Sequence, residues 1–200
     1  MKRVLISLLL LLPLALPAQE SDRFGSWLFL EANKSFDNGL SLMIHNEHDT
    51  YEPTRFDCGY VRVSVGYKVL KWLKVGVNYA PLCSADHSWS HYGEAEVVGT
   101  LKSGDLSVSI RERYRHGFTN GKNELRSRLK VAYSLPDTPW GFYVAPEVFT
   151  RGNDWLRTRH YCSCTYDLNP YVQFETYYMY YAFKNTPPEN VLGLGFNFHL

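Results

Sequence analysis

The feature that most constrains this chain is an alternation of apolar and polar residues that recurs along almost its whole length. In the segment "YVRVSVGY", Val61, Val63 and Val65 fall on one face of an extended strand, while Arg62 and Ser64 fall on the other. A period of two residues is that of a β-strand, whereas an amphipathic helix spaces its apolar residues three and four apart. The chain is therefore predicted to be all-β.

Eleven such runs follow one another, separated by turn residues: 26–36, 39–49, 58–68, 70–82, 91–102, 105–117, 123–135, 140–150, 155–167, 169–183 and 189–200. Segments of about ten residues with this alternation indicate a transmembrane β-barrel. The connections also alternate between short ones, such as "LKSGD", and long ones, such as "NEHDTYEPTRFDCG", as expected at the two ends of an outer-membrane barrel. Residues 19–200 are thus predicted to form one closed antiparallel up-and-down barrel domain.

The number of strands is less directly given, because bacterial barrels have an even number and the runs are odd in number. If the short connections face the periplasm, the run from Leu40 starts there and the run ending at Leu200 returns there. This parity predicts ten strands, with Ser26 to Phe36 left as an additional strand or a segment inside the lumen. Twelve strands, with one run unrecognised, is the alternative. A soluble secreted β-protein, such as a β-sandwich, is a further alternative.

The N-terminus has the composition of a secretory signal peptide. Lys2 and Arg3 precede an apolar stretch, Val4 to Leu16, that is shorter than the ~20 residues of a membrane-spanning helix. The small residue Ala18 offers a cleavage site, so residues 1–18 are predicted to be removed on export. Together with the barrel pattern, this places the protein in the bacterial outer membrane.

The last segment, "NVLGLGFNFHL", shows how the two faces of such a strand differ. Leu192, Leu194 and Phe196 fall on one face, and Gly193 and Gly195 on the other. The wall of a barrel that faces lipid must be apolar, so the leucine face is expected to contact outer-membrane lipid. An apolar C-terminal strand is also similar to the signal that the barrel assembly machinery recognises. We therefore expect that machinery as a partner and a monomer as the final state.

The other face of the runs carries most of the charged residues. A charged side chain that faces lipid at the bilayer midplane costs about 2–4 kcal/mol. These side chains are therefore predicted to point into the lumen. The predicted lumen cluster comprises Glu94, Glu96, Arg111, Arg113, Arg115, Arg126, Arg128, Glu147, Arg157 and Arg159.

Partners within this cluster are expected across neighbouring runs, because opposite charges on paired strands attract. Glu94 and Glu96 are expected beside Arg113 and Arg115, and Glu147 beside Arg157 and Arg159. The remaining arginines require water, anions or an inserted segment. The lumen is predicted either to be closed by its side chains, giving a structural barrel, or to form a narrow passage that prefers anions.

Enzymatic and nucleic-acid functions find little support in the sequence. The formal net charge is +1, so there is no basic field to attract nucleic acid, and no phosphate-binding loop or other cofactor motif is present. No cofactor is therefore expected. A catalytic alternative is a lipid hydrolase, similar to a lipid A deacylase, that uses His87 or His91 with Ser88 or Ser90. The competing explanation is that these residues belong to a polar surface loop.

Four cysteines remain to be placed. Cys58 and Cys83 fall in two long connections at the same end of the predicted barrel, so an exported chain is able to join them in a disulfide. Cys162 and Cys164 are two residues apart on one strand, and they are expected on its apolar face. No metal site is expected.

Several of these segments resemble a known family. They are "FGSWLFLEANKSF", the R-x-R pairs in "RERYR", "RSRLK" and "RTRHY", the segment "YVAPEVF", and the closing "VLGLGFNF". Together they are similar to the domain-of-unknown-function family 2490, and the resemblance covers nearly all of the chain after the signal peptide. It implies an exported outer-membrane barrel of a kind common in Bacteroidetes. The family has no established activity, so no catalytic residue follows from it. The cysteine pairs and the final "HL" depart from its pattern.

Overall fold

The structure, a computed structural model, describes residues 23–51 and 55–200. These residues form eleven β-strands: β1 (Arg23–Ser35), β2 (Leu40–Tyr51), β3 (Arg55–Leu70), β4 (Leu73–Ser84), β5 (Trp89–Ser103), β6 (Leu106–Gly117), β7 (Asn123–Ser134), β8 (Trp140–Arg151), β9 (Asp154–Asn169), β10 (Val172–Phe183) and β11 (Glu189–His199). The predicted signal peptide, residues 1–18, lies outside the described residues. In the described ranges, no helix has the length and apolar character needed to cross a membrane.

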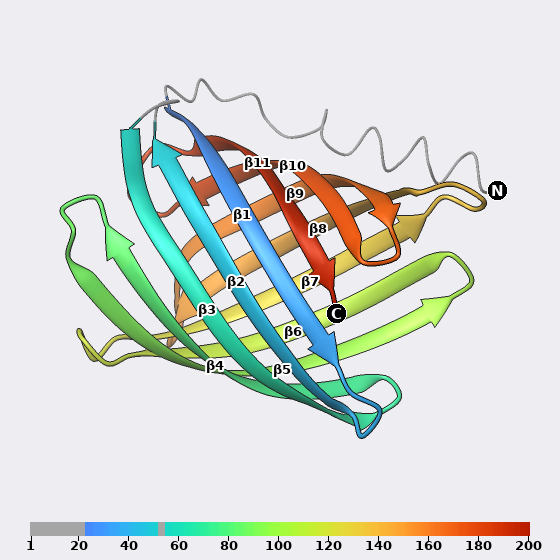
Figure 1. Cartoon of the computed structure of the whole chain (residues 1–200). Coiled ribbons are helices and arrows are strands. Elements are labelled where there is room, and N and C mark those ends of the chain that lie inside the picture. Colours follow the sequence, from blue (N-terminus) through green and yellow to red (C-terminus); the bar gives the residue numbers. More distant parts are fainter. Residues whose placement is uncertain (1–22, 52–54) are drawn as a thin grey trace.

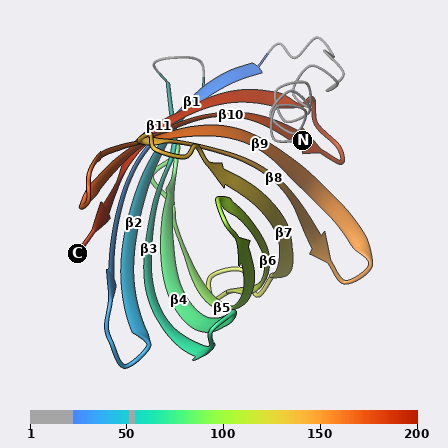
Figure 2. The ribbon, with the colours of Figure 1, turned by 90° about the vertical axis from the view of Figure 1, so that its right-hand side faces the viewer.

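The eleven strands close into a barrel (Figure 1). Strands that follow one another in the sequence pair antiparallel, whereas β1 pairs in parallel with β11. This parallel seam runs from Arg23 opposite Glu189 to Asn33 opposite His199. An odd number of strands requires one such pair, because the first and last strands of an odd antiparallel series run in the same direction. The view turned by 90° shows the sheet curving round to bring β1 and β11 together (Figure 2).

The predicted number of ten strands, and its alternative of twelve, is wrong. Residues 26–36, which that prediction left out of the wall, fall almost entirely within β1, and β1 is hydrogen-bonded to β2 on one side and to β11 on the other. The prediction relied on the even number of strands typical of bacterial barrels, in which every pair of neighbouring strands is antiparallel. The strands form one closed circuit and not the two stacked sheets of a β-sandwich, so that form of the soluble alternative is wrong.

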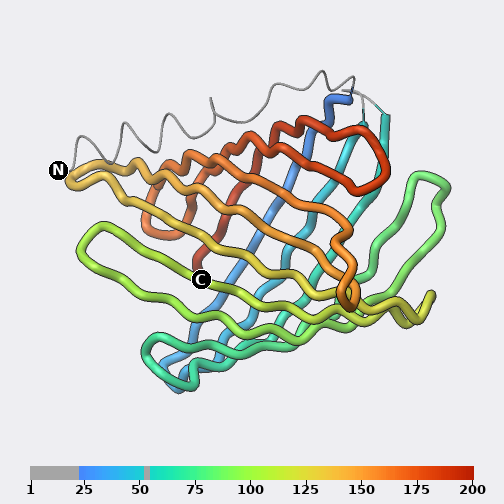
Figure 3. The backbone as a smooth tube through the Cα atoms, turned by 180° about the vertical axis from the view of Figure 1, so that it is seen from behind, coloured from blue at the N-terminus to red at the C-terminus, as the bar shows by residue number. Residues whose placement is uncertain are grey.

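The connections are shorter than the sequence indicated, because strand pairing continues into segments with the polar composition of a loop. In "NEHDTYEPTRFDCG", β2 extends to Tyr51 and β3 begins at Arg55. In the next segment expected as a long connection, β4 extends to Ser84 and β5 begins at Trp89. The backbone trace accordingly shows extended hairpins joined by narrow turns (Figure 3). Loop length alone therefore does not distinguish the two ends of the barrel.

The two walls of the barrel are the reverse of those in a water-soluble protein. Large apolar side chains on the outer wall are exposed, including Leu30 at 53%, Val77 at 60% and Ile110 at 56%. On the inner wall, Arg113 and Glu147 are each only 1% exposed. A soluble protein buries its apolar residues and leaves charges in water, so this arrangement calls for a particular explanation.

The outer wall carries a carboxylate in the middle of β6. Glu112 is exposed there between Ile110 and Tyr114, and its Oε2 accepts a hydrogen bond of 2.6 Å from the Ser127 hydroxyl on β7. The alternation predicts an apolar residue at this position. Glu112 thus places a carboxylate between two exposed apolar side chains of the same strand.

Part of the inner wall is apolar as well, beside the seam. The buried cluster there consists of Trp27, Phe29, Tyr177, Met179, Tyr181 and Val191. Glycines on β11 make room for these rings: a Cβ at Gly193 would meet the ring of Tyr177, and one at Gly195 would meet Phe29. The small residues of "LGLGF" therefore serve the packing of the lumen.

Candidate functional site

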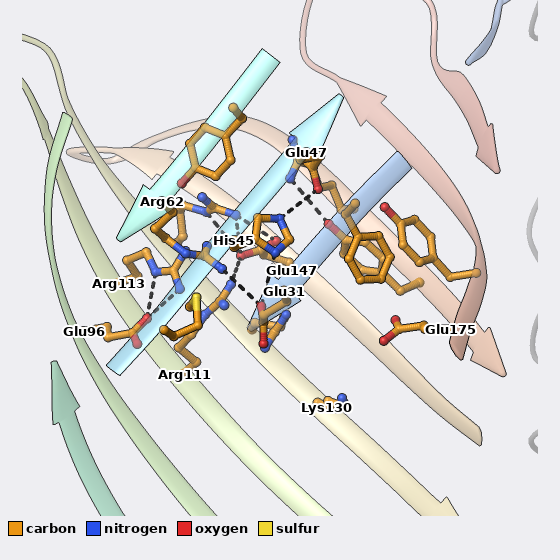
Figure 4. A pocket seen from close by; sticks show the side chains of 18 of the residues that line it. Glu31, His45, Glu47, Arg62, Glu96, Arg111, Arg113, Lys130, Glu147 and Glu175 are labelled. Carbon is orange, nitrogen blue, oxygen red and sulfur yellow. Dashed lines mark hydrogen bonds and ion pairs between the residues drawn. The ribbon is translucent and has the colours of Figure 1, made fainter. Parts of the chain in front are cut away.

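A cavity of about 470 Å³ lies in the lumen, and each of the eleven strands contributes to its lining. It extends from His199, next to the C-terminal end of β11, to Asp49 and Arg157 near the opposite end of the barrel. Figure 4 shows that its charged side chains converge from several strands toward the axis. The cavity is the candidate functional site, because it is where the charged residues of the sequence pattern come together.

The first part of the site joins β5 and β6. Glu96 lies opposite Arg113 in the register, and its Oε2 accepts hydrogen bonds from Arg113 Nε and Nη2 at 2.9 and 2.6 Å. Glu94 lies opposite Arg115 and accepts a bond of 2.7 Å from its Nε. Arg113 also approaches Glu94 at 3.5 Å. These contacts join the four residues as the sequence pattern indicated.

The second part is centred on Glu147 of β8. Its Oε1 accepts a hydrogen bond of 2.6 Å from Arg111 Nη2 and one of 3.2 Å from Arg126 Nε. Arg157 and Arg159, the partners expected from the sequence, interact elsewhere. Arg157 Nη2 bonds Glu124 at 2.8 Å, and Arg159 donates to the Tyr161 and Tyr181 hydroxyls while packing over aromatic rings.

The third part of the site consists of cations that have no carboxylate of the described chain in direct contact. Among the described residues, Arg128 and Lys130 of β7 have no acidic group within 4.0 Å. The Lys130 ammonium lies 3.7 Å from the centroid of the Tyr143 ring, a cation–π contact. Tyr143 donates to Glu175 at 2.5 Å, and Glu175 also accepts hydrogen bonds from Ser163 and Asn197. Glu175 is therefore satisfied by neutral donors.

Sequence reasoning missed an acidic group on β1 and β2. His45 is hydrogen-bonded to Glu31 at 3.2 Å and lies 3.5 Å from Glu47, while Arg62 approaches Glu31 at 4.0 Å. The signal was present in "IHNEHD", where His45, Glu47 and Asp49 alternate with other residues. This pattern did not lead to a predicted acidic group, because β1 was left out of the wall and the end of β2 was assigned to a loop.

The candidate catalytic residues lie at the turn between β4 and β5 and at the start of β5. The Ser88 hydroxyl donates to Asp86 at 2.6 Å, and this bond, together with one from the Ser88 amide, lowers the pKa of the Asp86 carboxyl. His91 Nδ1 is hydrogen-bonded to the Tyr79 hydroxyl at 2.7 Å, and the ring of His87 stacks on Phe56.

Ser90, the other candidate nucleophile, is half-buried on β5 opposite Leu82. The two serines and the two histidines thus interact with other residues and not with one another. The structure does not bring a serine and a histidine together as a nucleophile and its base, which a hydrolase requires.

The cysteines are all free thiols. Cys58 lies opposite Ser84 in the register and Cys83 lies opposite Gly59, so neighbouring positions place the two side chains on opposite faces of the sheet. The Cys58 thiol donates to Asp49 at 3.0 Å inside the lumen. The structure therefore does not bring Cys58 and Cys83 together as a disulfide. Cys162 and Cys164 flank the inward-facing Ser163, which places them on the outer wall.

The chain is similar to a known protein family and to a solved structure. A family model described as "Protein of unknown function (DUF2490)" matches residues 24–191. The chain belongs to the DUF2490 family. The match confirms the resemblance of the sequence segments, and it runs from the beginning of β1 into β11. No curated protein matches the chain.

A solved structure has a fold similar to that of this member of the DUF2490 family. It is described as "NanC porin structure in rhombohedral crystal form" and superposes with a TM-score of 0.61. The alignment has 18% sequence identity and covers 89% of this chain and 98% of that chain. At this identity the similarity establishes a shared barrel fold, and functions are compared below only as a proposal.

Proposed function

We propose that this DUF2490 protein is an integral barrel of the bacterial outer membrane whose lumen is a narrow, charge-lined passage for small solutes. The observation that carries the proposal is the inverted wall: exposed leucine, valine and isoleucine outside, and buried arginine and glutamate inside. Hydrocarbon on the outside and water on the inside give both walls a favourable solvent. Export by a signal peptide at residues 1–18 and assembly through the C-terminal strand are parts of the same proposal.

The shape of the cavity favours a passage over a barrel that is only structural. Residues near both ends, such as Asp49 and His199, line one cavity, which supports a space that continues along the lumen. Its volume of about 470 Å³ lies within the range for small-molecule sites, and it limits the solutes to small ones. The barrel fold shared with a protein described as a porin supports the same view.

Single-channel recording in a planar lipid bilayer tests the passage. We expect the purified chain to give small conductance steps. Met43 lines the cavity and Leu42, its neighbour, is 42% exposed on the outer wall, so they form a matched pair. Met43→Trp is expected to reduce the conductance and Leu42→Trp to leave it unchanged. An inserted chain that conducts nothing would contradict the passage, and equal effects of the two variants would place the current outside the lumen.

A further inference from the structure

Three cations lie close together at one place in the lumen. Arg111 on β6 is directly opposite Arg128 on β7, and Lys130 is two residues further along the same face of β7. Directly opposite residues in an antiparallel pair have Cα atoms about 4.5–5.5 Å apart, and the two β7 residues are separated by about 7 Å. All three side chains line the same cavity.

Two of the three cations in this group have no carboxylate in direct contact within the described chain. Of the three cations, Arg111 has a carboxylate partner, Glu147, and Glu147 also binds Arg126. Glu175 accepts a hydrogen bond from the Tyr143 hydroxyl, and the Tyr143 ring contacts Lys130. In Figure 4, Lys130 lies apart from the ion pair of Arg113 and Glu96. Glu147, which lies opposite Arg128 in the register, and Glu175 are near enough to offset part of the charge, but neither forms an ion pair with Arg128 or Lys130.

The hydrogen-bonding groups at this place are also incomplete. Arg111 is 7% exposed, and its Nε has no hydrogen-bond partner among the described residues. The same is true of the buried Nε of Arg128. A buried donor left without an acceptor costs roughly 1–3 kcal/mol, so both guanidinium groups favour an acceptor that enters from the cavity.

We propose that Arg111, Arg128 and Lys130 form a binding site for a dianionic oxyanion, namely a phosphate or sulfate group, free or carried by a small solute. Guanidinium groups present paired N–H donors that match the oxygens of such a group, and the lysine adds a point charge. A dianion also carries more charge toward the three clustered cations than a single carboxylate or a chloride ion does. The inference deepens the proposed function, because it names the class of solute that the passage would hold.

Isothermal titration calorimetry of the full chain in detergent micelles, at constant ionic strength, tests this site. Inorganic phosphate, sulfate and glycerol 3-phosphate are titrated separately, with chloride as the comparison ion. We expect the three oxyanions to bind and chloride to give no comparable heat. Tighter binding of glycerol 3-phosphate than of phosphate would identify an organic phosphate as the solute, and the reverse order would identify the free ion.

Variants assign the binding to the three residues. Arg128→Gln and Lys130→Gln should each weaken phosphate binding by about tenfold or more, the factor for losing one charge-assisted contact. Arg128 has no ion pair within the described chain, so its replacement is not expected to unfold the barrel. Lys122→Gln, at an exposed turn position, removes the same charge outside the lumen and should leave the affinity unchanged.

Absence of phosphate binding, or an equal loss of affinity in Lys122→Gln and Arg128→Gln, would overturn the anion site. The binding experiment requires neither a membrane nor a current. Phosphate binding by a chain that does not conduct would thus keep the site and contradict the passage, while conduction without phosphate binding would do the opposite.

Discussion

Arg113 and Glu96 face each other across β5 and β6 and are joined by two hydrogen bonds to one carboxylate oxygen, at 2.9 and 2.6 Å. Arg113 is 1% exposed, and its guanidinium also lies 3.5 Å from Glu94. A guanidinium so deeply buried depends on both carboxylates for compensation. The pair therefore connects the register of the strands to the stability of the charged lumen.

Replacement of Arg113 should destabilise the barrel. Arg113→Gln leaves Glu94 and Glu96 without a shared cation, and breaking a buried pair in this way costs about 3 kcal/mol. The free energy of unfolding by urea in detergent micelles measures the loss. Lys102→Gln, at an exposed position of β5, is the control and should change stability by less than ~0.5 kcal/mol. Equal stabilities of the two variants would show that the lumen pair contributes nothing.

Replacement of Glu112 should stabilise the barrel, whereas replacement of Arg113 destabilises it, if the outer wall faces lipid. A carboxylate on a lipid-facing wall is unfavourable, though less so than arginine or lysine, so Glu112→Leu should stabilise the barrel in lipid vesicles by about 1 kcal/mol. The change also removes the hydrogen bond from Ser127, which limits the gain. Unfolding in vesicles by denaturant measures the effect.

The same substitution inside the lumen is the control for Glu112. Glu124 is 8% exposed and binds Arg157 at 2.8 Å, so Glu124→Leu leaves a cation unpaired and should destabilise the barrel. A loss of stability at both positions would contradict a hydrocarbon environment at Glu112.

Enlarging a glycine on the inner face of β11 should disturb the seam. In Gly193→Ala the new methyl group meets the ring of Tyr177, and overpacking of this kind costs about 1–3 kcal/mol. Gly99→Ala on β5 adds the same methyl group where no atom lies within 4 Å, so its stability should not fall. Thermal unfolding in micelles compares the two, and equal melting temperatures would contradict the packing described at the seam.

The cysteines should all remain reduced in the folded chain. Alkylation of the denatured protein without a reductant, followed by mass spectrometry, should find all four cysteines modified. Cys58 and Cys83 point to opposite faces of the sheet, so the closed barrel does not allow their sulfur atoms to meet. A peptide pair linked through these two residues would show that the register of β3 and β4 differs from the one described.

The fold class followed from sequence because alternation reports directly which face of a strand a residue occupies. Glu96 and Arg113 could be matched for the same reason, since they lie on neighbouring strands. The strand number could not be obtained in this way. Alternation reports nothing of how the first and last strands meet, and the parallel pairing of β1 with β11 is a property of the closed ring.

The contacts of Glu147 show a second limit. Its partner Arg111 belongs to β6, two strands away from β8, and long side chains reach across the intervening β7 inside a narrow lumen. Pairing rules for adjacent strands favoured Arg159, which is opposite Glu147 in the register but directs its guanidinium toward Tyr161 and Tyr181. Curvature of the wall, which the sequence pattern does not contain, determines these contacts.

Membrane fractionation tests the central claim most directly, because it asks which solvent the outer wall meets. The full chain, expressed in a bacterium with an outer membrane, is followed by immunoblotting through separation of the aqueous periplasmic fraction and an alkaline carbonate wash of the membranes. We predict that it remains in the washed outer-membrane pellet. Recovery in the periplasmic fraction, or release by carbonate, would contradict a barrel whose exposed leucines and valines are in contact with lipid.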